Sequence, residues 1–146
     1  MSAVEAKDIA QKLLDSMGIP AVVEIESDEP VYLNISSDDS ALLIGKGGEN
    51  LRSIQNMINT LYHRKSQEFG YVGVDINGYK KERILKVQAI AQEAADKARE
   101  TGEDQHLKPM NAFERRSVHT LLSEDSDIAT DSEGEGVNRH IVIKKR

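Results

Sequence analysis

Cysteine and tryptophan are both absent from this chain of 146 residues. Without cysteine, the protein has no disulfide, thiolate metal site, iron–sulfur cluster or cysteine nucleophile. Aromatic residues make up 4% of the chain, so few side chains are candidates for stacking on bases. No apolar run approaches the roughly 18 residues of a membrane span, and the N-terminus lacks a basic segment followed by an apolar stretch. We therefore expect a soluble, cytoplasmic protein with no direct membrane insertion.

Net charge is −6, which by itself argues against a nucleic-acid partner. The charges are unevenly distributed, however. Segments 44–65 and 79–86 each carry four basic residues and one acidic residue, and segment 139–146 carries four basic residues and no acid. The acidic residues concentrate in 24–29 and 123–135. Basic faces on an acidic body favour a selective binder, and ordinary solvated surface charge is the alternative.

Hydrophobic periodicity in the first half predicts the order helix, strand, strand, helix, glycine loop, helix and strand. Apolar residues recur at helical spacing in the first of these segments, which ends at Gly18, whereas the next two segments alternate in polarity. The predicted elements are a helix over 3–17, an antiparallel hairpin of strands around 23–25 and 31–35 joined by a turn at 27–30, a short helix over 41–44, a longer helix from residue 49 and a strand over 71–76.

A boundary between two compact units is predicted at Asn77-Gly78. Beyond it we expect a long helix over 80–100, an extended piece at 106–110, a helix over 112–122 capped by Asn111, and strands near 127–132 and 139–144 around a Gly-Glu-Gly turn. The predicted fold class is α+β, with two small tandem domains at 1–78 and 79–146. Each would pack antiparallel or mixed strands on helices.

Two predicted helices meet at Gly45-Lys46-Gly47-Gly48. Glycine lets the backbone turn sharply and approach another chain closely, and the amides of the following helix favour an anion. Lys46 adds a full positive charge. A P-loop is excluded because four residues do not separate its glycines and no Ser or Thr follows the lysine. The alternative is a turn that only connects two helices. We list Ile44, Gly45, Lys46, Gly47, Gly48, Leu51 and Arg52 as nucleic-acid-binding candidates, with Ile44, Leu51 and strand 31–35 lining a base groove.

This order of elements resembles the KH domain in its bacterial, type II arrangement, over about residues 3–77. In KH domains a Gly-x-x-G loop clamps the backbone of about four nucleotides of a single strand. The resemblance implies that residues 45–48 form this clamp.

Arg115 and His119 lie four residues apart on the predicted helix 112–122, so they occupy one face. A guanidinium and an imidazole in this arrangement can bind phosphate. The alternative is a structural pair satisfied where the helix meets its sheet. Arg116, Arg139 and the rest of the basic segment 139–146 would assist the pair.

The Arg-x-x-x-His pattern resembles the R-3-H domain, a small binder of single-stranded nucleic acid. Several further motifs resemble the bacterial Jag family, also called SpoIIIJ-associated, KhpB or EloR, in which a KH domain precedes an R-3-H domain. This resemblance implies a non-catalytic, cytoplasmic RNA-binding protein linked to post-transcriptional control, cell elongation and envelope growth. It also implies single-stranded RNA, or single-stranded DNA, as ligand and a second small KH protein or a second copy as partner. The motifs are 75–79, 81–83, 107–110, 114–119 and 132–136.

Two other classes of function stay open. One is a protein-interaction scaffold or dimerisation module with little RNA affinity. The other is a ribonuclease that uses His119 and His140 as acid and base. The four histidines, at 63, 106, 119 and 140, show no ligand-like pairing in the sequence, so we expect no metal site and no cofactor.

Overall fold

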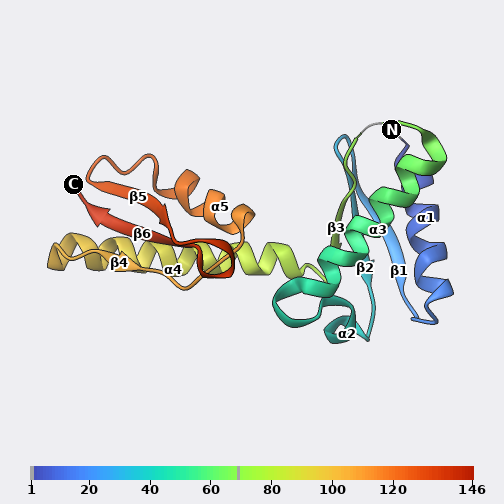
Figure 1. Cartoon of the computed structure of the whole chain (residues 1–146), viewed down its shortest axis with the longest axis horizontal. Helices are drawn as coiled ribbons and strands as arrows, with labels where there is room; N and C mark the ends of the chain where they lie inside the picture. Colours follow the sequence, from blue (N-terminus) through green and yellow to red (C-terminus); the bar gives the residue numbers. More distant parts are fainter. Residues whose placement is uncertain (1, 69) are drawn as a thin grey trace. The chain divides into compact units, whose positions relative to one another are not determined.

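The chain forms two compact units, Met1–Lys80 and Lys81–Arg146, in a computed structural model that describes residues 2–68 and 70–146 (Figure 1). Each unit has a three-stranded sheet, with strand orders β1-β2-β3 and β4-β6-β5, and each has its own hydrophobic core. Helices packed on small antiparallel or mixed sheets confirm the predicted α+β class.

The first unit follows the predicted order of elements. Strands β1 and β2 pair antiparallel, and β2 and β3 pair parallel. A 3-10 turn at Lys46–Gly48 separates the second and third helices. The elements are α1 (Ala3–Ser16), β1 (Val22–Asp28), β2 (Val31–Ser36), α2 (Ser40–Ile44), α3 (Glu49–Ser66) and β3 (Gly73–Ile76).

Helices α1 and α3 supply the apolar residues that cover one face of the first sheet (Figure 1). Because side chains alternate along a strand, Leu33 and Val74 enter this core while Tyr32 and Asp75 lie on the other face. Leu14 of α1 and Ile58 of α3 are also fully buried. The core therefore joins both helices to the sheet.

Strand β3 is shorter than the predicted strand 71–76, because its pairing with β2 begins at Gly73, opposite Tyr32. The Val72 amide donates to Oδ1 of Asn59 at 2.8 Å, and Nδ2 of Asn59 donates to the Val72 carbonyl at 2.9 Å. Oε1 of Gln55 accepts from the Val74 amide at 3.0 Å. Side chains of α3 thus satisfy backbone groups along the free edge of β3, which limits strand addition there.

The second unit is built around a sheet in which β6 pairs antiparallel with both of its neighbours. Residues of α4 and α5 share one core with residues of β5 and β6, including Ile128, Ile141 and Ile143. Strands β5 and β6 each begin one residue later than predicted. The elements are α4 (Tyr79–Thr101), which starts in the first unit, β4 (Gln105–His106), α5 (Ala112–Leu122), β5 (Ile128–Glu133) and β6 (His140–Lys145).

The start of α5 carries the predicted cap. Oδ1 of Asn111 accepts from the Glu114 amide at 2.8 Å, and Oε2 of Glu114 accepts from the Asn111 amide at 3.2 Å. This reciprocal capping box confirms Asn111 as the N-cap. Across residues 2–68 and 70–146, no helix is both long and apolar enough to cross a membrane.

Candidate nucleic-acid interface

The glycine loop adopts a backbone that favours glycine at three positions. Gly45, Gly47 and Gly48 have φ values of 72°, 62° and 81°. A Cβ atom at Gly45 would lie 2.7 Å from Cγ of Asn50, and one at Gly48 would lie 3.2 Å from Cε1 of Tyr79. At Gly47 no described atom lies within 4 Å of such a Cβ. The loop is therefore tightly packed at its two ends and open at its tip.

The tip carries positive charge next to a helix start. Lys46 and Gly47 are exposed, and α3 begins at Glu49 after the N-cap residue Gly48, which has no side chain to cap the first amides. Arg52 is exposed on α3. Neither Lys46 nor Arg52 has an ion-pair partner among the described residues, so both charges are available to an anion from solution.

Asn50 holds the loop in shape, and the sequence prediction missed it. Its Nδ2 donates to the Leu42 carbonyl at 2.8 Å, across the loop from α3 to α2. Asn50 also lies so close to Gly45 that its side chain leaves no room for a Cβ atom there. The sequence did contain a signal for this role, because Asn50 places a side-chain amide, which can donate and accept hydrogen bonds, in the first turn after the glycine loop.

The predicted apolar groove needs correction. Leu51 is only 2% exposed and belongs to the core of the first unit, as do the inward residues of strand 31–35, namely Val31, Leu33 and Ile35. These side chains support the loop from below and do not present a surface. Ile44 is half-buried at the core margin. Leu42 of α2, beside the loop, is an exposed apolar residue at 64% exposure.

Arg115 and His119 both have partners inside the second unit. One Nη of Arg115 donates to the Met110 carbonyl. The His119 ring lies between two hydroxyls of β5, with Nδ1 2.6 Å from Oγ1 of Thr130 and Nε2 3.1 Å from Oγ of Ser132. The structural role weighed for this pair therefore holds in part. Arg115 keeps further N–H donors for a ligand, since a guanidinium has five.

Arg116 and Arg139 lie near this pair in different ways. Arg116 is exposed on α5. Nη1 of Arg139 donates to the Gly134 carbonyl at 2.8 Å, and the Arg139 carbonyl accepts from the Met110 amide at 3.2 Å. Met110 thus links the guanidinium of Arg115 to the backbone of Arg139. The three arginines lie at the end of the second unit that contains the start of α5 and the turn between β5 and β6.

Lys80, one of the basic residues of segment 79–86, is engaged within the first unit. Its Nζ donates to Oε1 of Gln55 at 2.6 Å, and its amide donates to Oδ1 of buried Asp75 at 2.9 Å. Burial lowers the pKa of Lys80, against the opposing effect of Asp75. Burial, together with Asp75 and other charges, also raises the pKa of Tyr32 to about 12. These groups brace the sheet and are poor candidates for ligand contact.

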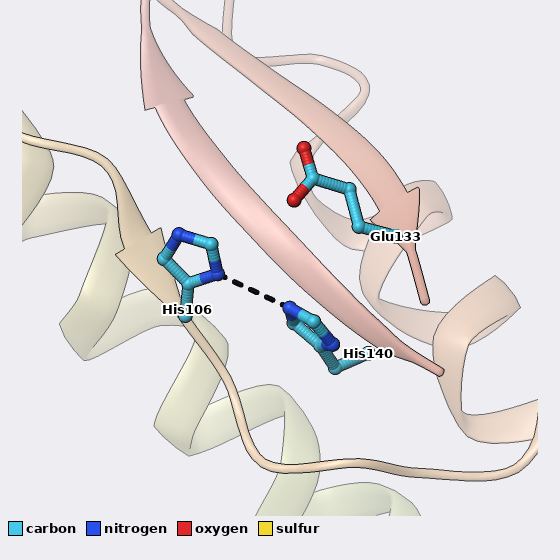
Figure 2. Close-up of side chains that lie close together, drawn as sticks. All are labelled: His106, Glu133 and His140. Atoms are coloured by element: carbon cyan, nitrogen blue, oxygen red, sulfur yellow. Dashed lines mark hydrogen bonds between the residues drawn. The ribbon is translucent and has the colours of Figure 1, made fainter. Parts of the chain in front are cut away.

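The expectation that the histidines are unpaired is wrong for His106 and His140. Nδ1 of His106 lies 3.1 Å from Nε2 of His140, because β4 pairs with β6 (Figure 2). Glu133 is the direct cross-strand partner of His140, and the three side chains place a ligand atom each within 4.8 Å of one another. The sequence gave no local signal of this contact, because His106 and His140 are 34 residues apart in the chain.

The same register separates His119 from His140. His119 contacts Thr130 and Ser132, whose partners on β6 are the core residues Ile143 and Ile141. His140 pairs with Glu133, one residue further along, and successive residues of a strand point to opposite faces. The two histidines therefore lie on opposite faces of the sheet. The ribonuclease alternative, which needs them at one reacting atom, lacks that geometry.

Comparisons with known proteins match each half separately. The family described as KhpA/KhpB, KH domain matches residues 5–76, and the R-3-H domain family matches residues 85–145. A Bacillus subtilis protein named RNA-binding protein KhpB is 31% identical, over 97% of this chain and 70% of its own length. Proteins of that name from Clostridium symbiosum and Streptococcus pneumoniae are 30% and 29% identical. The chain spans 64% and 43% of their lengths.

Proposed function

This chain belongs to the KhpB family, also named Jag, and we propose that it binds single-stranded RNA without catalysing a reaction on it. A KH domain over 1–78 and an R-3-H domain over 79–146 would each contribute a contact. The relatives that cover most of the chain are named RNA-binding proteins, and both matched domain families bind nucleic acid rather than transform it. The His119–His140 arrangement gives no support to a hydrolytic centre.

The observation that carries the proposal is the geometry of the glycine loop. Gly47 leaves the tip open, Lys46 is exposed beside it, and the first amides of α3 lie directly behind both. The Glu49 amide already donates to the Lys46 carbonyl, so a phosphate group at the tip would gain hydrogen bonds from the next amides of the first turn of α3 and charge from Lys46. Because Asn50 and Tyr79 pack against the ends of the loop, it is preorganised, which reduces the entropy lost on binding.

Bases of the bound strand would lie beside the loop, against Leu42 and the exposed part of Ile44, with Arg52 following the backbone. In the second domain, Arg116 and the remaining donors of Arg115 would hold another stretch of phosphate. His119 and Arg139 would keep that end of the domain in place through their contacts with Ser132 and Gly134. Single-stranded DNA is the competing ligand, because phosphate contacts alone do not distinguish the two.

In the cell we propose a cytoplasmic regulator that acts after transcription and is linked to cell elongation and envelope growth. A second small KH protein, or a second copy of this chain, would be its protein partner. The matched KH family includes both KhpA and KhpB, which supports a partner of the same fold. A scaffold with little RNA affinity is the competing function.

Fluorescence anisotropy of a labelled single-stranded RNA pool tests this proposal. Lys46→Asp should weaken binding by at least about tenfold, the equivalent of one charge-assisted hydrogen bond. Gly47→Asp should also weaken RNA binding, because it places a carboxylate, which repels phosphate, at the open tip of the loop. Lys7→Asp, an equal charge reversal on an exposed residue of α1, is the matched control and should bind almost like the wild type.

Salt dependence gives the second readout. Log affinity should fall linearly with log salt, and Lys46→Asp should reduce that slope by about 0.7 for one lost contact. Circular dichroism must show that each variant is folded. Equal weakening by Lys46→Asp and Lys7→Asp would reject the loop as the clamp. RNA affinity that is absent in the wild type would instead favour the scaffold.

A further inference from the structure

The outer face of the second sheet carries two histidines and a carboxylate that no role in RNA binding uses. His106 is on β4, His140 on β6 and Glu133 at the end of β5, so one side chain comes from each of the three strands (Figure 2). This face is opposite to the one that packs on α4 and α5. The cluster is therefore separate from Arg115 and His119.

The hydrogen bonds around His140 fix which of its nitrogens carries a lone pair. Nδ1 of His140 lies 3.0 Å from the carbonyl of Asn138, and a carbonyl can only accept. Nδ1 must therefore be the protonated nitrogen, and in the neutral ring Nε2 is an acceptor. That lone pair faces Nδ1 of His106 at 3.1 Å. A backbone carbonyl that orients a histidine through its other nitrogen is a common support of metal ligands.

The spacing of the two nitrogens is close to that of a metal centre. Two imidazole nitrogens that bind one tetrahedral Zn²⁺ at about 2.0 Å lie about 3.3 Å apart. The present 3.1 Å is the distance of a hydrogen bond from His106 to His140, so a metal ion would replace one proton. That proton can move to Nε2 of His106, which leaves both rings neutral.

The surroundings give the cluster a firm base. Val142 lies on the same face as the two histidines, pairs with His106 across the sheet and is 1% exposed, so neighbouring side chains enclose it. Lys144 is the nearby opposing charge: its Nζ is 3.3 Å from Asp131 and 3.9 Å from Glu133. Since Lys144 is closer to Asp131, the carboxylate of Glu133 is only partly neutralised.

We propose that His106, His140 and Glu133 form a binding site for a late first-row divalent metal ion, with Zn²⁺ as the first candidate. Imidazole ligands suit zinc, copper, nickel and iron, whereas Mg²⁺ and Ca²⁺ prefer oxygen alone. Nδ1 of His106, Nε2 of His140 and one oxygen of Glu133 would bind the ion. Three protein ligands leave at least one position open to solvent.

A calorimetric titration of the full chain with Zn²⁺ tests the site. The absorption spectrum of the protein with bound Co²⁺ reports the coordination of the metal ion. The wild type should bind one ion. His106→Ala, His140→Ala and Glu133→Gln should each weaken binding by more than about tenfold. His63→Ala, which removes the histidine of the first domain, should leave binding unchanged, and Mg²⁺ should not compete.

Lys144→Met provides a test in the opposite direction. Removal of the competing cation should strengthen Zn²⁺ binding, a result that a merely damaged fold does not produce. If His140→Ala does not fold, His106→Ala and Glu133→Gln carry the comparison, because both residues are exposed. The proposal is overturned if the wild type does not bind Zn²⁺, if these variants bind as well as the wild type, or if His63→Ala weakens binding equally.

Discussion

Asn59 and Val72 pair through two hydrogen bonds, 2.8 Å from the Val72 amide to Oδ1 and 2.9 Å from Nδ2 to the Val72 carbonyl. The side-chain amide of α3 thereby replaces a neighbouring strand at the edge of the sheet. Both partners are buried, so no water can substitute if the side chain is lost. This pair satisfies the backbone of Val72 just before β3 begins at Gly73.

Removal of the Asn59 amide should therefore be costly. Asn59→Ala leaves a buried N–H and a buried C=O unpaired, and we expect a loss of about 2–4 kcal/mol in the free energy of unfolding. Urea denaturation measures it. Asn56→Ala, on an exposed position of the same helix, should change stability by less than about 0.5 kcal/mol. Similar effects of the two substitutions would contradict this role of Asn59.

Gly45 and Gly47 should respond differently to alanine, although both have positive φ. At Gly45 the new methyl group meets Asn50 at 2.7 Å and displaces its hydrogen bond to Leu42, whereas the methyl at Gly47 enters open space. Gly47, at φ 62° and ψ 20°, is in the left-handed region, which costs other residues about 1–2 kcal/mol. Gly45, at φ 72° and ψ 179°, is in a region that essentially only glycine occupies. In denaturation experiments we expect Gly45→Ala to lower the free energy of unfolding by about 1 kcal/mol more than Gly47→Ala does. The reverse order would show that Asn50 does not hold the loop.

Glu114 joins the cap of α5 to α4. Its Oε1 accepts from Nε of Arg83 at 2.9 Å while Oε2 completes the capping box, and the residue is 6% exposed. Glu114→Ala should lower the free energy of unfolding by about 2–3 kcal/mol, since it removes the Glu114 half of the capping box and leaves Arg83 without this partner. A double-mutant cycle with Arg83→Met separates the two effects. A coupling energy of zero would rule out a contribution from the ion pair.

Arg99 should make the second unit sensitive to acid. It contacts Asp96, Asp125 and Asp127 at 2.7–2.9 Å. The hydrogen bond from Arg99 holds the pKa of Asp127 below its usual 3.8. A lowered carboxyl pKa stabilises the fold at pH values above 3.8, and that stabilisation is lost as pH falls further.

The melting temperature of Arg99→Gln should accordingly fall below that of the wild type at pH 7, and the difference should shrink as pH drops below 3.8. Added salt should shrink it as well. Lys97→Gln, an exposed neighbour on the same helix, serves as the control. A difference that is constant with pH would mean that Arg99 acts through packing instead of charge.

The local features of the fold could be predicted from the sequence because they depend on neighbours in the chain. Periodicity located the helices, Gly18 marked the end of α1, and Asn111 with Glu114 identified the cap of α5. The predicted strand 71–76 began two residues before β3, because the alternating pattern does not show where pairing with β2 starts.

The candidate site was predicted less completely. The exposed loop and Lys46 followed from glycine spacing, but the helical spacing of Leu51 does not distinguish a core residue from a groove residue. Its burial depends on how α3 packs on the sheet. The approach of His106 to His140 depends on the β4–β6 register, which joins segments far apart in the chain. Long-range pairing of this kind leaves no pattern in a single sequence.

The central claim is that the glycine loop holds the backbone of single-stranded RNA. An NMR titration of the isotope-labelled chain with a short single-stranded RNA tests it at each amide. The largest shifts are predicted at Gly47, Gly48, Glu49 and Asn50, with a second group around Arg115 and Arg116. Shifts that leave residues 46–50 unchanged while RNA binds elsewhere would contradict the account.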